Sequence, residues 1–481
     1  MAAPFDRAFF LLLDGARVDL FAEHMKRGDL PNVARYLAEP GVHTTAVSVF
    51  PSVTGVAYVP YLTGMFPGRA NLPGYRWFDR EHYHRRPLSM MRFRNYSGLG
   101  SYMMNRDLSK EYKTLFELIK PSSNIFSGIS RGTGFRRNAA FFRRIPAAIK
   151  FFRTGDWDHI DEAGERFLLD AAMRRRERFT FHTTYSIDEY SHHHGPFSDR
   201  VRERYYDFDR VVGRLVARLK TTGQLERSLI MIGADHGHTE VKAHFDLEGF
   251  IEKRGLKTLY FPKKFRNWIG AKAAVMVAGN GMGHVYIKGP STWSEQPTGG
   301  ELLAEDPTLV DEMLESPAID HVMFRPDGTG SVEVRSRRGR ALIKLEGDNV
   351  HYTVMGGDPF GYPLLPATMT RAECLLHTSA TDYPDAPLQC AQVFDSPRAG
   401  DFILSASYGW DLREREGKID MQSSHGSLHR EHMRVPFLMN HRMADSTRVP
   451  RSVDAFPTIL ELLGRSVPSG IDGRSLVSLP S

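Results

Sequence analysis

Apolar runs alternate with amphipathic stretches along the first half of this chain. Residues 8–13 are apolar throughout, and residues 178–188 and 228–235 are runs rich in apolar and β-branched residues, as is typical of buried parallel strands. Between and beside these runs lie segments that predict helices, at 29–38, 160–177 and 198–222, with a helix followed by a strand over 114–130. This alternation predicts an α/β fold with a mostly parallel central sheet flanked by helices.

Residues 290–399 follow a different pattern. They contain many Pro and Gly residues and short alternating stretches such as GSVEVRS and ALIKLEG, which predict β-hairpins. We therefore expect residues 1–289 and 400–481 to form one α/β core. The segment between them is expected to be an inserted, hairpin-rich cap or lid.

Each of the three predicted strands ends in an acidic residue. These residues are Asp14, Asp188 and Asp235. Ligands of open α/β sheets collect outside the carboxyl ends of the strands, so the three acids are expected to converge in space. The alternative for each acid is that it caps a helix or turn that follows.

Histidines accompany these acids. SIDEYSHHHG places His192 four residues after Asp188, and GADHGHTE places His236 directly after Asp235, while SSHGSLHREH adds His425. Carboxylate oxygen and imidazole nitrogen are ligands for zinc or manganese, although a lone histidine is more often a satisfied polar residue than a ligand. Two such clusters predict two divalent metal ions, which are the equipment of phosphoryl-transfer hydrolases.

Thr54 stands at a corner in the sequence FPSVTG, between a strand-like run and the helix-like start GVAYVPYL. A helix cap explains a threonine here, and so does a nucleophile. The hydroxyl is a weak nucleophile at its own pKa, which a bound cation lowers. The backbone N–H groups of a helix N-terminus also favour an attacked phosphate. Ser52 and Thr63 are less suitable, since neither stands at the expected junction of loop and helix.

Together, the motifs LLLDG, FPSVTG, SIDEYSH, ADHGH and SHGSLHREH, and the closing segment RSVDAFPTILELLGRSVPSGIDGRSL, resemble the alkaline phosphatase superfamily. The resemblance is strongest to its nucleotide pyrophosphatase/phosphodiesterase (type I phosphodiesterase) branch and covers residues 8–290 and 400–477. It implies an alkaline phosphatase-like core and the hydrolysis of phosphodiester or pyrophosphate bonds with two metal ions, usually zinc. Thr54 would attack phosphorus and form a phospho-threonine intermediate, which water then releases.

The resemblance also implies two sets of metal ligands. Asp14, Thr54, Asp235 and His236 would form one, and Asp188, His192 and His425 the other. Among neighbouring histidines, His425 stands in the HG dipeptide of the family and His192 has the family spacing from its acid. His193, His194, His429 and His432 have no such match.

The chain departs from the family pattern after the nucleophile. Phosphodiesterases of this branch usually carry an asparagine there that contacts a phosphate oxygen, whereas here Tyr75 stands near that place and Arg76 follows it. Either residue is a candidate to bind a non-bridging oxygen. Since an arginine also suits a dianionic monoester, the alternative is a phosphomonoesterase on the same scaffold, with lipid phosphates among its substrates.

A basic, aromatic stretch at 131–153 has Phe and Ile at helical spacing and Arg and Lys on other faces. It predicts either a helix packed on the core with a solvated basic edge or an interfacial helix on anionic lipid. The second interpretation supports peripheral membrane contact and a third hypothesis, a metal-stabilised docking protein without turnover.

The remaining composition adds few constraints. The formal net charge is +6 over 481 residues, and no nucleic-acid reading module is visible, so a small-molecule or lipid phosphate ester is the expected partner. The apolar run near the N-terminus is too short to span a bilayer and lacks a cleavage site, which favours a cytoplasmic protein. Two cysteines, Cys374 and Cys390, do not predict a disulfide framework.

Overall fold

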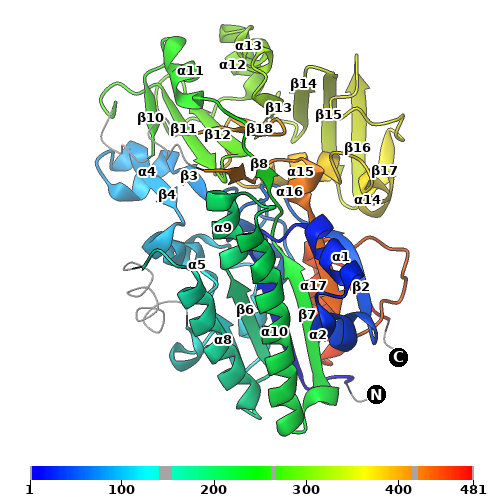
Figure 1. The fold of residues 1–481 in the computed structure, drawn as a ribbon. Helices are drawn as coiled ribbons and strands as arrows, with labels where there is room; N and C mark the ends of the chain where they lie inside the picture. Colours follow the sequence, from blue (N-terminus) through cyan, green and yellow to red (C-terminus); the bar gives the residue numbers. More distant parts are fainter. Residues whose placement is uncertain (1–2, 140–153, 262–266, 414–420, 479–481) are drawn as a thin grey trace.

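A six-stranded sheet forms the lower part of the molecule in Figure 1, which shows the computed structural model. The structure describes residues 3–139, 154–261, 267–413 and 421–478. The strand order is β2-β21-β7-β1-β6-β5. Strands β7, β1, β6 and β5 are parallel, whereas β21 is antiparallel to β7 and β2 to β21, so the prediction of a mostly parallel central sheet is confirmed. The strands are β1 (Arg7–Leu13), β2 (Val42–Val47), β5 (Ser122–Ile125), β6 (Phe179–Thr184), β7 (Ser228–Ala234) and β21 (Arg434–Met439).

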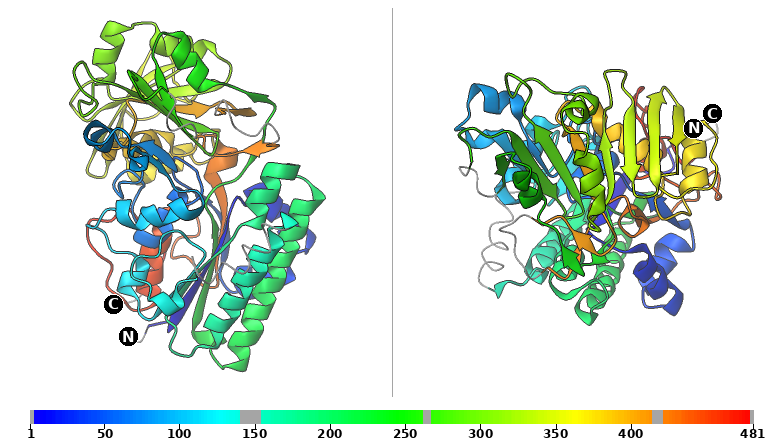
Figure 2. Two further views of the ribbon diagram at one scale, coloured as in Figure 1. Left: turned by 90° about the vertical axis from the view of Figure 1, so that its left-hand side faces the viewer. Right: turned by 90° about the horizontal axis from the view of Figure 1, so that it is seen from above.

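The central strands of this sheet are buried along their whole length, because helices cover both faces. Figure 2 (left) shows α8 (Asp158–Met173) and α10 (Asp199–Thr221) on one face and α17 (Ala455–Leu462) on the other. The helices expected at 160–177 and 198–222 are α8 and α10. Helix α10 buries one stripe of side chains at spacings of three and four residues, namely Val201, Tyr205, Phe208, Val212, Leu215 and Leu219.

A nine-stranded sheet forms the upper part of Figure 1, in the order β10-β11-β12-β18-β13-β14-β15-β16-β17. All neighbouring strands are antiparallel except the pair β10 and β11. The strands are β10 (Thr258–Tyr260), β11 (Ala273–Ala278), β12 (Met282–Ile287), β13 (Ile319–Phe324), β14 (Val332–Ser336), β15 (Gly339–Glu346), β16 (Asn349–Met355), β17 (Thr368–Thr370) and β18 (Phe402–Ala406).

The second sheet contains the hairpin expected from GSVEVRS and ALIKLEG, which is β14 and β15. The same sheet also contains β10, β11 and β12, which precede residue 290, and β18, which follows residue 399. The boundaries of the cap at 290 and 399 stay a prediction. Within the described ranges, no helix is long and apolar enough to cross a membrane.

Shorter elements complete the described fold. The helices are α1 (Val18–Arg27), α2 (Pro31–Val33), α3 (Val59–Thr63), α4 (Arg80–Arg85), α5 (Met103–Asp107), α6 (Leu115–Leu118), α9 (Ser186–His194), α11 (Leu247–Lys253), α12 (Gly299–Glu305), α13 (Leu309–Glu315), α14 (Arg371–Thr378), α15 (Ala386–Gln392) and α16 (Arg430–Met433). The short strands are β3 (Arg76–Phe78), β4 (Phe93–Asn95), β8 (Thr239–Glu240), β9 (Ala243–His244), β19 (Trp410–Asp411) and β20 (Ser423–Ser424).

Strand β6 is shorter than the sequence predicted. The strand predicted over 178–188 was too long: β6 ends at Thr184 and α9 begins at Ser186, so Asp188 lies in the first turn of a helix. An acidic residue in that turn interacts favourably with the helix dipole, so Asp188 is compatible with a helical position. Of the basic stretch 131–153, residues 140–153 lie outside the described residues.

Cys374 and Cys390 are buried free thiols.

Candidate active site

Three acidic residues from separate parts of the chain meet at one edge of the six-stranded sheet. Asp14 directly follows β1 and Asp235 directly follows β7, and these parallel strands pair so that Leu13 lies opposite Ala234. Asp188 comes from the other neighbour of β1, because β6 leads into α9. Carboxyl ends of parallel strands meet at the same sheet edge, so the structure brings the acids together as the sequence predicted.

Thr54 contacts the first set of acids. Its Oγ1 lies 3.3 Å from Asp14 Oδ1 and 3.2 Å from His236 Nε2. The same His236 Nε2 is 3.1 Å from Asp235 Oδ2 and 3.4 Å from Asp14 Oδ1. We call these four residues the Thr54 group. Its members other than Thr54 are completely buried, and Tyr58 donates a hydrogen bond to the second oxygen of Asp14.

Thr54 is partly exposed, although the residues before and after it in the chain are buried. In the fully described stretch from Ala46 to Gly68, Thr54 is the only residue that is not buried. Gly55 follows in the left-handed region, with φ of 79°, and the chain then enters a 3₁₀ turn at Val56 and the helix α3. The core therefore holds the rest of the motif and leaves Thr54 partly exposed.

A second set of residues surrounds Asp188. His192, one helical turn later on α9, places Nε2 3.5 Å from Asp188 Oδ1, and His425 places Nε2 3.8 Å from the same oxygen. We call these three residues the Asp188 group. His236 links it to the Thr54 group, because its Nε2 is 3.9 Å from Asp188 Oδ1 and its ring stacks on that of His425 with centroids 3.6 Å apart.

Backbone carbonyl groups fix the orientation of these three histidines. Each ring is bonded through Nδ1: His192 to the carbonyl of Ser423 (2.8 Å), His236 to that of Gly237 (3.1 Å) and His425 to that of Ser52 (3.0 Å). A carbonyl oxygen only accepts, so Nδ1 carries the hydrogen and the neutral ring presents the lone pair of Nε2 to the acids. This is the arrangement of a metal-ligating histidine.

The spacing of these atoms fits divalent metal ions. A tetrahedral site with bonds of about 2.0–2.1 Å separates its ligand atoms by about 3.3 Å. The distances within the two groups run from 3.1 Å to 3.8 Å. Asp235 Oδ2 is buried without a hydrogen-bond partner among the described residues and lies 3.1 Å from His236 Nε2, so a cation bound by both atoms would satisfy them.

The pKa values of the acids differ between the groups. Burial, followed by the charges of Asp235 and Asp188, raises the pKa of Asp14 well above its ordinary value. Burial also acts to raise the pKa of Asp188, but the attraction of His192 and the hydrogen bond from His238 outweigh it and hold that pKa well below its ordinary value. Cations at the Thr54 group would remove the repulsion between its carboxylates.

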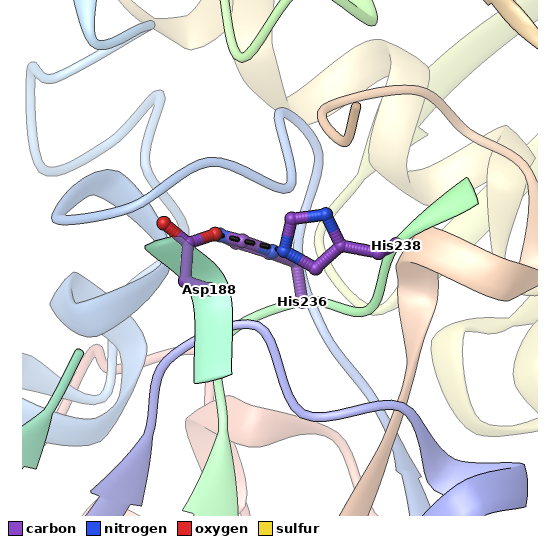
Figure 3. A group of neighbouring side chains, drawn as sticks. All are labelled: Asp188, His236 and His238. Atoms are coloured by element: carbon purple, nitrogen blue, oxygen red, sulfur yellow. Dashed lines mark hydrogen bonds and ion pairs between the residues drawn. The ribbon is translucent and has the colours of Figure 1, made fainter. Parts of the chain in front are cut away.

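One residue of the site, His238, was missed by the sequence analysis. Its Nε2 lies 2.8 Å from Asp188 Oδ1, and the side chains of Asp188, His236 and His238 point toward one another in Figure 3. The only indication in the sequence was that His238 is the second histidine of ADHGH. In a turn, no periodic pattern shows toward which side of the chain a side chain points. The other histidines of the motifs are not in the metal-binding groups of the described residues: His193 and His194 are exposed, and His432 bonds Thr239 and Ser427.

The two candidates for substrate binding lie at the start of β3. Tyr75 is half-buried, and its pKa is raised mainly by burial, with smaller contributions from Glu189 and Asp14. Arg76 bonds Asn95 Oδ1 through Nε (3.1 Å) and the carbonyl of Val277 (3.4 Å). Both residues stay predictions as phosphate ligands.

The sequence itself identifies the family. Residues 8–291, more than half of the chain, match the family model of type I phosphodiesterases/nucleotide pyrophosphatases. The chain belongs to this family. The resemblance stated from the motifs is thereby confirmed, and the chain is a metal-dependent hydrolase of the phosphodiesterase/nucleotide pyrophosphatase type. No curated protein sequence matches the chain.

Solved structures with the same fold include hydrolases of phosphorus compounds. Phosphonoacetate hydrolase from Sinorhizobium meliloti 1021, in complex with phosphonoacetate, has 16% identity, 95% coverage of both chains and a TM-score of 0.58. Murine ectonucleotide pyrophosphatase/phosphodiesterase 5 has 12% identity, 96% coverage of both chains and a TM-score of 0.56. An inactive threonine-to-alanine variant of that murine protein, in complex with AMP, has 12% identity, 96% coverage of both chains and a TM-score of 0.55.

Proposed function

We propose that this protein cleaves phosphodiester or pyrophosphate bonds with two zinc ions and with Thr54 as the nucleophile. The observation that carries this proposal is the position of Thr54, a partly exposed residue whose Oγ1 lies 3.3 Å from Asp14 Oδ1 and 3.2 Å from His236 Nε2. The mixed set of carboxylate and imidazole ligands favours zinc. The ligands would be Asp14, Thr54, Asp235 and His236 at one ion and Asp188, His192 and His425 at the other.

The reaction would proceed in two steps on this chain. Cations bound there would lower the pKa of the threonine hydroxyl and offset negative charge on the phosphate oxygens. In the first step the hydroxyl of Thr54, which lies 3.3 Å from Asp14 Oδ1, would lose its proton to solvent, and Oγ1 would bond to phosphorus while the P–O bond to the leaving group breaks and the leaving oxygen departs with the electron pair. Water then attacks the phospho-threonine, breaks its P–O bond and restores the hydroxyl. Tyr58 holds Asp14 in place throughout.

The similar structures support two points of the proposal, a threonine as the nucleophile and a phosphorus oxyanion as the substrate. A threonine-to-alanine variant is described as inactive for the murine protein, and it binds AMP, a nucleotide phosphate. The bacterial hydrolase binds phosphonoacetate, another phosphorus oxyanion. Thr54 is the candidate for the corresponding role in this chain because it is partly exposed and its hydroxyl lies beside Asp14.

A trapping experiment tests the covalent step. The metal-loaded protein is mixed with bis-p-nitrophenyl phosphate, quenched in acid and digested, and the peptide that contains Thr54 is examined by mass spectrometry. We expect a p-nitrophenyl phosphate group esterified to Thr54, because one p-nitrophenolate leaves and the other stays on phosphorus, and no such group on Ser52 or Thr63. Rapid turnover with this group on another residue, or on none during a burst of p-nitrophenolate, would disprove the assignment of the nucleophile.

The phosphomonoesterase alternative is favoured by one observation, the presence of Tyr75 and Arg76 where the family usually has an asparagine. An arginine can form two hydrogen bonds with the extra charged oxygen of a monoester. At equal metal content, a strong preference for p-nitrophenyl phosphate over the diester would favour this alternative, and Arg76→Met would then reduce that preference. Its lipid-phosphate form depends on residues 131–153 and stays a prediction.

A further inference from the structure

Four histidines surround the acids, and one of them has a different partner at Nδ1. His192, His236 and His425 each face a backbone carbonyl there, as described above. The Nδ1 of His238 instead lies 3.0 Å from the hydroxyl of Ser423. A hydroxyl can donate as well as accept, so this contact does not place the hydrogen of His238 on Nδ1.

The other nitrogen of His238 decides where its hydrogen lies. Nε2 is 2.8 Å from Asp188 Oδ1, which is the length of a hydrogen bond and shorter than every distance between proposed ligand atoms in the two groups. An ionised carboxylate only accepts, so Nε2 carries the hydrogen. A neutral ring then accepts at Nδ1 from the hydroxyl of Ser423.

We propose that His238 is a positioning residue for the Asp188 metal site and not one of its ligands. Its Nε2–H holds Asp188 Oδ1 toward His192 and His425, and Ser423 keeps His238 in the tautomer that can do so. This inference rests on the proposed function, because it requires that the Asp188 group holds a metal ion. Hydrogen bonds of this kind orient ligating carboxylates and increase the affinity for the metal.

The packing around His238 restricts the position of its side chain. The side chain is completely buried, and a Cβ atom at Gly15, where φ is +73°, would lie 2.6 Å from His238 Nε2 and 2.9 Å from Cα of Asp188. A larger residue at position 15 would thus displace the hydrogen-bonded pair. Glycine at this turn allows β1 to end directly beneath the pair.

Ser423 serves both histidines on this side of the site. Its carbonyl accepts from Nδ1 of the proposed ligand His192, while its hydroxyl donates to Nδ1 of the positioning residue His238. Ser423 lies on β20, which pairs with β8 directly after the ADHGH turn. One short strand pair therefore fixes the orientation of both rings.

Zinc affinity distinguishes a positioning residue from a ligand. Metal-free protein is titrated with Zn²⁺ in competition with a chromogenic chelator, which gives the number of sites and the Kd of each. The variants are His238→Leu, which removes the N–H; His238→Gln, which retains an N–H at similar reach; and Ser423→Ala, which removes only the hydroxyl. The control is His24→Leu, since His24 is also a buried histidine beside a carboxylate, that of Asp29, but lies in α1.

We expect two sites in every variant. In His238→Leu the Kd of one site should rise about 10–100-fold, as is typical when the hydrogen-bond partner of a ligand is lost. His238→Gln should restore it to within about threefold, Ser423→Ala should raise it only about threefold to tenfold, and the control should leave it unchanged.

Two results would overturn the inference. One is an unchanged Kd in both His238→Leu and Ser423→Ala, and the other is the loss of one whole site in His238→Leu and in His238→Gln, which would make His238 a ligand. If His238→Leu does not fold, as judged by circular dichroism, the smaller change in Ser423→Ala decides between the first result and the expected one. Absence of zinc binding by the wild-type protein would instead contradict the proposed function.

Discussion

The two halves of the site use opposite balances of charge. The Thr54 group has two carboxylates and one imidazole, whereas the Asp188 group has one carboxylate and two imidazoles, with His238 as an additional hydrogen-bond donor. The pKa of Asp14 is accordingly raised by burial and by its acidic neighbours, and that of Asp188 is lowered by its histidines. Without cations, the carboxylates of the Thr54 group repel one another, whereas the charge of Asp188 is balanced by the histidines around it.

The halves also differ in how the fold supplies them. The acids of the Thr54 group directly follow two central parallel strands, so the core fixes them. The Asp188 group comes from the first and last turns of the short helix α9 and from the residue after β20, which is held by the small β8–β20 pair. We infer that the first half depends on bound cations for its charge balance, and the second on local hydrogen bonds for its geometry.

The largest expected effect concerns the hydroxyl that belongs to only one half. Thr54→Ala should lower kcat for bis-p-nitrophenyl phosphate by at least about 10³-fold, because it removes the proposed nucleophile. The matched control is Thr63→Ala, which changes a nearby threonine whose hydroxyl donates to the carbonyl of Val59 and accepts from the N–H of Met65. Steady-state kinetics at equal zinc content measure both variants. A Thr54→Ala protein that keeps the wild-type rate would remove the functional distinction between the halves.

Removal of one ligand from each half should abolish metal binding there and leave the other half loaded. Asp235→Asn and His192→Ala should each bind one zinc ion where the wild type binds two, and each should lower kcat by about 10²-fold or more, since both ions act on the phosphate group. Elemental analysis of dialysed protein counts the metal. If both variants retain two ions, the division into two groups is wrong.

In the metal-free protein the same substitution should have opposite effects in the two halves. Asp188→Asn removes the partner of several buried imidazoles and should lower the free energy of unfolding by about 3 kcal/mol. Asp14→Asn relieves repulsion while keeping an acceptor for Tyr58, and should raise it by about 1–2 kcal/mol. Urea denaturation in the presence of a chelator tests this, and effects of equal sign would contradict the comparison.

The pH dependence of the metal-free protein should sharpen this contrast further. The pKa of Asp14 is higher in the folded than in the unfolded protein, so its favourable contribution is complete below its ordinary pKa of 3.8 and is lost as the pH rises toward the folded pKa. Asp14→Asn should therefore gain most at neutral pH and least near pH 4. Asp188 behaves oppositely: its contribution is present above 3.8 and is lost as the pH falls below it. Denaturation curves over this range would refute the account if Asp14→Asn gained stability only in acid.

The sequence predicted one half of the site better than the other. Asp14 and Asp235 end continuous apolar runs, which mark buried parallel strands and hence the sheet edge. Asp188 was placed on a strand because the Thr-rich run before it has no visible break, although the chain turns into α9 after Thr184. His238 was missed because its role depends on Ser423, which is distant in the sequence.

The second sheet shows a similar limit of sequence analysis. The hairpin of β14 and β15 was recognised from local alternation, which short-range pairing preserves. The pairing of β12 with β18, in which Met282 lies opposite Ser405, joins segments separated by the whole intervening region. No local pattern in the sequence specifies such a partner strand. For this reason the sequence did not predict that strands outside residues 290–399 join this sheet.

Anomalous X-ray diffraction from crystals of the zinc-loaded protein tests the central claim most directly. We predict two peaks at the zinc absorption edge, each about 2.0–2.2 Å from its ligands. One should lie among Asp14, Thr54, Asp235 and His236, and the other among Asp188, His192 and His425, with His238 bonded to Asp188 and not to the metal. Peaks located elsewhere, or no peak beside Thr54, would contradict the account.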